Sequence, residues 1–236
     1  MIETLWIDNP PLNVLSAETL EALRDGIANL AAETRVVVVR GRGERAFSAG
    51  GDIASFRSPE ASRAIGIQAV ASLFEAAPVP VVAAIHGYCF GGGLEIALGA
   101  DIRIAHSDAQ LGFPEAGLGL LPGGGGTQRA PRLLTPGRAA WLLMSGERIS
   151  AARAEEWGLV EFVFDKLEEG IDEVAGTLAA QSPNSLREIK ALLRATREQR
   201  SDEQELAAFL RTLRSDEGQE GMAAFFEKRK PEWGLG

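Results

Sequence analysis

Two short runs of this chain are apolar at every position, Val36 to Val39 and Val81 to Ile85. A strand that is apolar on both faces is typically buried on both faces, as in parallel sheets that helices cover on each side. Segments with helical periodicity separate the runs, and the first begins after Ser16, a residue type that caps helices. Strands that alternate with helices predict an α/β core with parallel pairing.

The remaining elements follow the same pattern. Further strands are predicted at residues 5–7, 102–105, 110–113 and 159–164. The helix after Ser16 has an apolar face made by Leu20, Leu23, Ile27 and Leu30. Another helix is predicted after Ser150 and should end at Gly158, because glycine readily takes the left-handed conformation of a helix end.

Composition narrows the classes of function. The 236 residues carry a formal net charge of −9, which argues against general nucleic-acid binding because such binding relies on basic surface. The single cysteine, Cys89, cannot form an internal disulfide, and two histidines do not suggest a metal cluster. No apolar run has the length of a membrane span, and residues 1–5 lack the pattern of a signal peptide. We therefore expect a cytoplasmic protein with neither a membrane nor a nucleic-acid partner.

The pattern becomes purely helical beyond Ser182. We therefore expect an α/β core over residues 1–181 and a C-terminal helical region over residues 182–236. Ser201 to Gln204 fits a capping box, and one helical face follows it, formed by Leu206, Phe209, Leu210 and Leu213. This face packs either against a partner subunit or over its own core, and the pattern alone does not choose between the two.

Three consecutive glycines, Gly91 to Gly93, stand where the predicted strand that ends at Ile85 gives way to a helix that carries Glu95. An isolated glycine triplet is most simply a tight turn. At a helix start, however, the first N–H groups have no carbonyl partner, and glycine lets a ligand approach the backbone closely. Gly92 is therefore a candidate hydrogen-bond donor, with Glu95 one turn away on the same face.

Two further segments have related properties. Residues 46–53 come just after the predicted strand that ends at Arg40 and again run into glycines, so Gly51 can supply a second N–H donor and complete an oxyanion hole. Residues 111–119 place Glu115 among apolar neighbours, and we expect that carboxylate to be partly buried. Two carboxylates in an apolar pocket have shifted proton affinities, which suits general acid and base catalysis.

Other motifs have simpler interpretations. The run Gly123 to Gly126 lacks the Lys-Ser/Thr ending of a phosphate-binding P-loop, so we interpret it as a second wall of the pocket and a helix entry. His86 and His106 have no recognisable catalytic partner and are interpreted as structural or surface residues. Cys89 lies near the glycine triplet, where the role of a small buried hydrophobic residue fits it best.

Five segments together resemble the enoyl-CoA hydratase/isomerase (crotonase) family over nearly the whole chain. They are Ala49-Gly50-Gly51-Asp52, Gly91-Gly92-Gly93-Leu94-Glu95, Pro114-Glu115, Pro122-Gly123-Gly124-Gly125-Gly126-Thr127-Gln128-Arg129 and Glu220-Gly221-Met222-Ala223-Ala224-Phe225-Phe226-Glu227-Lys228-Arg229. Each segment is weak alone, but their order and spacing make the resemblance specific. It implies a crotonase-like spiral of ββα units, followed by a C-terminal helical oligomerisation region that builds trimers or dimers of trimers.

The resemblance also implies a site. The N–H groups of Gly51 and Gly92 would hold the thioester oxygen of an acyl-CoA, and Glu95 and Glu115 match the two catalytic glutamates of the hydratases. Further residues are expected to contact the substrate: Ala49, Gly50, Asp52, Ile53, Tyr88, Gly91, Pro114, Gly123, Phe209 and Lys228. Lys228 matches a position near the CoA phosphates that often crosses a subunit boundary. Coenzyme A is part of the substrate, so neither a separate cofactor nor a metal is expected.

Three activities stay open on the sequence. Two intact glutamates favour a hydratase, which adds water across the C2=C3 double bond of a 2-enoyl-CoA. An isomerase would use Glu115 alone to move a proton between C2 and C4, and a non-catalytic relative would keep the fold as a binding or scaffold protein, for RNA for example. The chain departs from the family in a late start and a short segment from Ile53 to Pro78, which leaves the acyl length of the substrate open.

Overall fold

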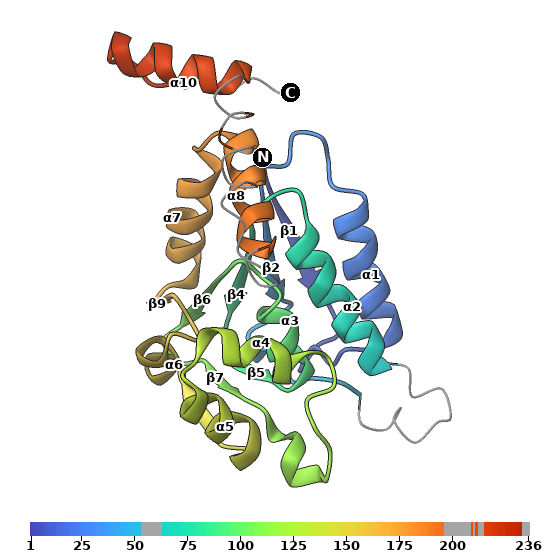
Figure 1. The fold of residues 1–236 in the computed structure, drawn as a ribbon. Coiled ribbons are helices and arrows are strands. Elements are labelled where there is room, and N and C mark those ends of the chain that lie inside the picture. Colours follow the sequence, from blue (N-terminus) through green and yellow to red (C-terminus); the bar gives the residue numbers. More distant parts are fainter. Residues whose placement is uncertain (53–62, 196–208, 210, 212–214, 233–236) are drawn as a thin grey trace.

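The computed structural model describes residues 1–52, 63–195, 209, 211 and 215–232, and within them the strands form two sheets (Figure 1). The first sheet has the order β1-β2-β4-β6-β9 and is parallel throughout, with strands Ile2–Ile7, Val36–Gly41, Val81–Ile85, Ile102–His106 and Phe162–Phe164. The second has the order β3-β5-β7-β8, with strands Ala46–Ser48, Tyr88–Phe90, Gln110–Gly112 and Arg148–Ser150. Only the β7–β8 pair in it is antiparallel.

From β2 to β7, consecutive strands alternate between the two sheets, which makes this part of the chain a spiral. Strands β2 and β3 precede α2 (Arg63–Ala76), and strands β4 and β5 precede α3 (Gly92–Ala97). Strands β6 and β7 precede the short 3-10 helix η2 (Pro114–Leu118) and then α4 (Gly126–Leu133). Each turn of the spiral therefore adds one strand to each sheet and then a helix, so the predicted architecture of ββα units is confirmed.

The valine strand β2 is buried on both faces, as its sequence predicts. Val37 and Val39 face the larger core with α1 (Ala17–Ala28) and α2, while Val36 and Val38 face a second core under α7 (Leu167–Ala179). Figure 1 shows these helices on opposite sides of the first sheet. Ser16 caps α1 as predicted, since its hydroxyl accepts a hydrogen bond from the Thr19 N–H at 3.2 Å.

Some predicted boundaries are wrong. The strand expected over residues 159–164 covers only Phe162–Phe164, because the amides of Leu159 and Val160 bond back to the carbonyl of Ala154 in a helix end. Both side chains are buried, which explains why the apolar run is longer than the strand. That helix, α6 (Ala151–Trp157), begins after Ser150 and ends at Gly158 as predicted. The three-residue strands β3, β5 and β8 are additional to the predicted strands, while α5 (Pro136–Ser145) lies between two predicted strands, where helices were expected.

The C-terminal region begins with α8 (Pro183–Ala195), which Lys190 fixes to the core. Its buried ammonium donates to the carbonyls of Phe74 and Val79 at 2.8 and 2.9 Å and pairs with Asp101 at 2.7 Å. The predicted capping box at 201–204 and the side chains of Leu206, Leu210 and Leu213 lie outside the described residues. Phe209, by contrast, is described and is exposed.

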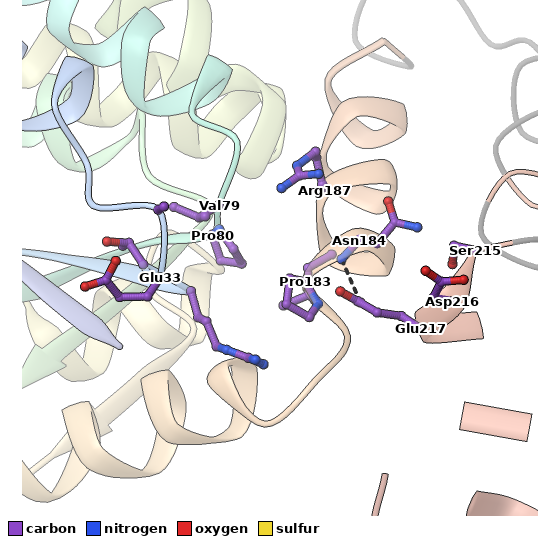
Figure 2. Close-up of a pocket in the computed structure, with 13 residues that line it drawn as sticks. Glu33, Val79, Pro80, Pro183, Asn184, Arg187, Ser215, Asp216 and Glu217 are labelled. Atoms are coloured by element: carbon purple, nitrogen blue, oxygen red, sulfur yellow. Dashed lines mark hydrogen bonds between the residues drawn. The ribbon is translucent and has the colours of Figure 1, made fainter. Parts of the chain in front are cut away.

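The last helix, α10 (Asp216–Glu227), lies at the outer end of the molecule beyond α8 (Figure 1). Glu217 joins the two helices, because its carboxylate accepts hydrogen bonds from the Asn184 N–H at 3.1 Å and from the Ser182 hydroxyl. Figure 2 shows the hydrogen bond between Asn184 and Glu217 beside a cavity of about 290 Å³ that separates the C-terminal helices from Val79 and Pro80 of the core. Within the described ranges, no helix combines the length and hydropathy of a membrane span.

Candidate active site

The carboxyl ends of three strands in the second sheet meet around one cavity of about 320 Å³. The glycines at 50–51 follow β3, those at 91–93 follow β5, and Glu115 follows β7. The glycine runs therefore follow the short strands of the second sheet and not, as the sequence suggested, the long valine strands of the first. The cavity is lined by Ala49, Gly50, Gly51, Ile67, Gly91, Gly92, Glu95, Pro114, Glu115, Leu118, Leu120, Leu121, Gly123 and Gly124.

Two backbone amides lie side by side in this cavity. A Cβ atom on Gly92 would lie 3.4 Å from the amide nitrogen of Gly51, and one on Gly50 would lie 3.4 Å from the amide nitrogen of Gly92. Within the described part of the chain, neither the Gly51 nor the Gly92 N–H donates a hydrogen bond. Gly92 is the first residue of α3, where N–H groups lack intrahelical partners. This pair is the arrangement of donors that an oxyanion hole requires.

Glycine is required at Gly91 for two reasons. Its φ of +50° lies in the region that favours glycine, and a Cβ there would lie 2.7 Å from Glu115 Oε1. The absence of a side chain therefore opens the space between the end of β5 and the carboxylate of η2.

Glu95 forms the inner wall of the cavity. Its side chain is on α3, is only 2 % exposed, and accepts a hydrogen bond at Oε1 from the Gly126 N–H at 2.8 Å. Burial raises the pKa of Glu95 above its ordinary value, while the amides of Gly124 to Gly126 and the charge of Arg129 oppose that rise. Glu95 is thus a buried carboxylate whose charged form the backbone stabilises.

Glu115 stands on the opposite side, in η2, and is half-buried as predicted. Among the described residues, its buried Oε2 has no hydrogen-bond partner. Burial raises the pKa of Glu115 to about 7, and the nearby charge of Glu95 acts in the same direction. Near neutral pH the carboxyl group of Glu115 is therefore present in both its protonated and its ionised form.

The outer wall is apolar. Leu118, Leu120 and Leu121 are 55 %, 49 % and 69 % exposed where they line the cavity. Large aliphatic side chains left in water at a pocket mouth mark a surface that a ligand covers. An apolar chain on this side and a carbonyl group at the glycine amides would fit the same cavity.

Comparison with known proteins identifies the family. The family model "Enoyl-CoA hydratase/isomerase" matches residues 2–235. The chain belongs to this family. It is 39 % identical to a "Probable enoyl-CoA hydratase" of Bacillus subtilis (strain 168), over 98 % of this chain and 95 % of the relative. It is also 36 % identical to a "Carnitinyl-CoA dehydratase" of Salmonella typhi, over 97 % of this chain and 93 % of the relative.

Solved structures agree with the fold. The enoyl-CoA hydratase from Bacillus anthracis has a TM-score of 0.91 and 38 % identity, covering 98 % of this chain and 95 % of that chain. DspI from Pseudomonas aeruginosa has a TM-score of 0.93 and 36 % identity, covering 99 % of this chain and 93 % of that chain. The crotonase-like fold is therefore established, together with membership of a family whose named relatives are enzymes.

Not every residue expected from the family pattern lies in the cavity. Ala49, Gly50, Gly91, Pro114 and Gly123 line it together with the glutamates and the amide pair. Four expected residues do not line it, namely Asp52, Tyr88, Phe209 and Lys228. Ile53 lies outside the described residues. Tyr88 is 39 % exposed and stacks on Phe90, and Lys228 is exposed after the end of α10.

Several lining residues carried no signal in the sequence. Ile67 is one of many apolar residues in α2, and its helix position does not reveal that it faces the cavity. Leu118, Leu120 and Leu121 follow no helix or strand periodicity that would show which way they face. The glycine run at 123–126 did predict a wall of the pocket nearby. Among described residues, no group of three or more His, Cys, Asp or Glu side chains is placed to hold a metal ion.

The three remaining candidates lie outside the cavity. His106 Nδ1 pairs with Asp108 at 2.6 Å and its Nε2 lies 2.8 Å from the Asp165 carbonyl, which fits a structural role at the surface. His86 does not line the cavity. Cys89 is fully buried in β5, as predicted, and burial raises the pKa of its thiol.

Proposed function

We propose that this protein is an enoyl-CoA hydratase that adds water across the C2=C3 double bond of a 2-enoyl-CoA. The observation that carries the proposal is the placement of Glu95 and Glu115 in one cavity with the free amides of Gly51 and Gly92. Family membership supports acyl-CoA chemistry. A relative with 36 % identity is named a dehydratase, which is the same class of reaction in the opposite direction.

The amide pair would bind the thioester oxygen. As hydroxide adds at C3, negative charge develops on that oxygen in an enolate-like state, and two fixed N–H donors stabilise it. One such donor contributes about 2.7–4 kcal/mol in other enzymes, so the pair supplies a large part of the rate. The positive end of α3 adds to this stabilisation at Gly92.

The two glutamates would divide the proton transfers. Glu95, whose charged form accepts the Gly126 N–H, takes a proton from water as the oxygen bonds to C3. Glu115, with a pKa of about 7, holds a proton and delivers it to C2. Together these transfers add one water and yield a 3-hydroxyacyl-CoA. The cycle closes when Glu95 releases its proton and Glu115 regains one.

An isomerase is the second candidate, because Glu115 alone has the pKa and the apolar surroundings that a proton shuttle between C2 and C4 needs. In that mechanism Glu95 has no proton to move. The two candidates therefore differ in whether oxygen from water enters the product.

We also propose a trimer or a dimer of trimers as the active form, in a cytoplasmic setting and with no cofactor beyond the CoA of the substrate. Apolar side chains left exposed on the C-terminal helices support assembly through them, namely Ile189, Leu193, Phe209 and Met222. Assembly would also bring Lys228 to a neighbouring subunit's CoA. Sizing with light scattering tests this, and a monomer at micromolar concentration would contradict it.

The direct test of the reaction follows the loss of the conjugated thioester absorbance of crotonyl-CoA and of longer 2-enoyl-CoAs. Hydration predicts uptake of isotopically labelled oxygen from water into a 3-hydroxyacyl product. Exchange of C2 protons without that uptake would replace the hydratase by the isomerase. A folded Gly92→Pro variant lacks one oxyanion donor and should have no measurable turnover, so full activity in it would contradict the proposed hole.

A further inference from the structure

Arg129 is a buried charge immediately behind the catalytic cavity. It is on α4, is 7 % exposed, and does not line the cavity itself. Its guanidinium forms a two-pronged pair with Glu75 of α2, at 3.2 Å from Nε and 3.0 Å from Nη2. Nη2 also donates to the Ser72 hydroxyl at 3.1 Å. Burying such a pair is costly, so it calls for an explanation beyond stability.

The same guanidinium fixes the turn that leads into α4. Arg129 Nη1 donates to the carbonyl of Gly124 at 3.2 Å. A Cβ on Gly125 would overlap with Nη1, so the guanidinium lies directly against that residue. The φ of Gly125 is +109°, which only glycine adopts without strain. On the side away from Glu95, the turn is therefore held by a planar, charged group that hydrogen bonds to Glu75, Ser72 and the Gly124 carbonyl fix in place.

The other side of this turn faces Glu95. The Gly126 N–H donates to Glu95 Oε1 at 2.8 Å, and a Cβ on Gly124 would lie 2.5 Å from Glu95 Oε2. Residues 124–126 are thus clamped between the inner carboxylate and the guanidinium. The Gly124 carbonyl accepts a hydrogen bond from the Arg129 side chain, while the amides of the turn face Glu95.

We propose that Arg129, locked in place by Glu75, is a positioning residue that aims the amides of the Gly124–Gly126 turn at Glu95 and supports its charged form. This proposal rests on the proposed function, because it assigns Glu95 the role of base. The charge of Arg129 lowers the pKa of Glu95 against the effect of burial. Helix α2 thereby acts on the reaction through a residue that never touches the substrate.

The ion pair between Arg129 and Glu75 can be tested with two variants that should shift the pKa of Glu95 in opposite directions. Arg129→Met removes a positive charge and leaves Glu75 negative, so the pKa of Glu95 rises and the acidic limb of kcat/KM moves to higher pH. Glu75→Gln leaves Arg129 positive and less neutralised, so that limb moves to lower pH. We expect shifts of about 0.5–1 pH unit, below the range for an unscreened neighbouring charge. For Arg129→Met, kcat should fall about tenfold with KM changed less than about threefold.

Arg129→Lys separates charge from geometry. Lysine keeps the charge but cannot form the two-pronged pair and hold the Gly124 carbonyl at once. The acidic limb should stay close to that of the wild type, while kcat falls to an intermediate value. If Arg129→Met does not fold, Glu75→Gln and Arg129→Lys still decide the proposal, because each is a smaller change.

Arg103 provides the matched control. It is also buried, donates to the carbonyls of Leu159 and Ala100 at 2.9 Å, and pairs with Glu161. None of these partners lines the cavity. A folded Arg103→Met protein should unfold more readily yet keep the wild-type pH profile. An equal shift in the Arg103→Met profile, or an unshifted profile in both Arg129→Met and Glu75→Gln, would overturn the proposal.

A second readout separates this proposal from the proposed function. Carboxyl carbon NMR of glutamate-labelled protein, with the Glu95 signal assigned through Glu95→Gln, gives the pKa of Glu95 without any substrate. If the wild type hydrates no 2-enoyl-CoA, the proposed function fails, but opposite shifts of the Glu95 signal would still support the role of Arg129. If the wild type is a hydratase and the Glu95 signal titrates identically in all variants, the Arg129 proposal alone fails.

Discussion

The two walls of the cavity hold the same functional group in opposite ways. Glu95 lies in a regular helix at 2 % exposure, with a backbone N–H on Oε1 and the charge of Arg129 behind the turn. Glu115 lies in a short 3-10 helix, half-buried, with no hydrogen-bond partner for its buried Oε2 among the described residues. One carboxylate is fixed by the protein, and the other is left for a ligand to satisfy.

This difference gives the two carboxyl groups of one apolar pocket different surroundings. Burial raises the pKa of both groups, and the amides of Gly124 to Gly126 oppose that rise for Glu95. Carboxyl groups in such different environments suit the base and acid roles that we propose for them. The glutamates are therefore distinguished by their surroundings and not by their own chemistry.

The largest effect should come from removing either carboxyl group. Glu95→Gln and Glu115→Gln should each lower the hydration rate by about 10²–10⁴-fold, because each removes one proton transfer while the amide keeps the shape. The double variant should lose little more than either single one, since groups that act as a unit are non-additive. Steady-state rates with crotonyl-CoA measure this, with binding of a saturated acyl-CoA as the control.

One result would break the comparison between the walls. If Glu95→Gln converts 3-enoyl-CoA to 2-enoyl-CoA at the wild-type rate, then Glu115 works alone. The inner carboxylate would then be structural, and the isomerase would replace the hydratase.

The pH dependence of kcat/KM should have an alkaline limb that reports the deprotonation of Glu115. Glu115 must be protonated to deliver a proton to C2, and its pKa is about 7. The value of kcat/KM should therefore fall about tenfold per pH unit once the pH is well above 7. Stopped-flow or steady-state profiles from pH 5 to 9 measure this limb. A profile that stays flat up to pH 9 would show that the protonated form of Glu115 is not required.

The free energy of unfolding should depend on pH because Glu115 is buried. Its pKa rises on folding from an ordinary value of 4.5 to about 7, so the folded state holds the proton more tightly than the unfolded state. Stability is therefore lost as the pH rises from about 4.5 to 7, by about 1–3 kcal/mol after allowance for solvent at this half-buried site. Glu115→Gln should unfold at higher denaturant than the wild type at pH 8, and close to it at pH 4. A lower midpoint at pH 8 would contradict this cost.

The smallest effect should come from a substitution in the apolar outer wall of the cavity. Leu121 is 69 % exposed, so Leu121→Ala should change the free energy of unfolding by no more than about 0.5 kcal/mol. Its effect should fall on KM, which should rise a few-fold for long 2-enoyl-CoAs and little for crotonyl-CoA, because only long chains cover the leucine. KM values across a chain-length series measure this. Equal changes at every length would place the acyl chain elsewhere.

Much of the fold was predictable because burial leaves a clear mark on strands such as β2. Four valines in a row admit few environments other than a parallel sheet with helices on both faces. The strands β3 and β5 have three residues each, too few for any periodicity to emerge. Their existence follows from the spiral, a long-range property, and the glycines after them were consequently attached to the wrong strands.

The candidate site was predictable where its residues are neighbours along the chain. Gly92 and Glu95 are tied by one helical turn, so their relation is readable from spacing. Ile67 and Arg129 act through contacts between elements distant in sequence, and nothing local marks them. The roles of Phe209 and Lys228 as substrate contacts stay predictions, because neither residue lines the cavity of this chain.

The burial of Cys89 has a practical consequence. It is the only thiol in the chain, it is fully enclosed in β5, and it lies three residues before Gly92. Because thiol reagents attack the thiolate, and burial raises the pKa of this group, the native protein should resist alkylation. Labelling will then occur only when the strand leading to Gly91 and Gly92 opens. The rate of alkylation therefore measures local unfolding beside the candidate active site, with no engineered probe.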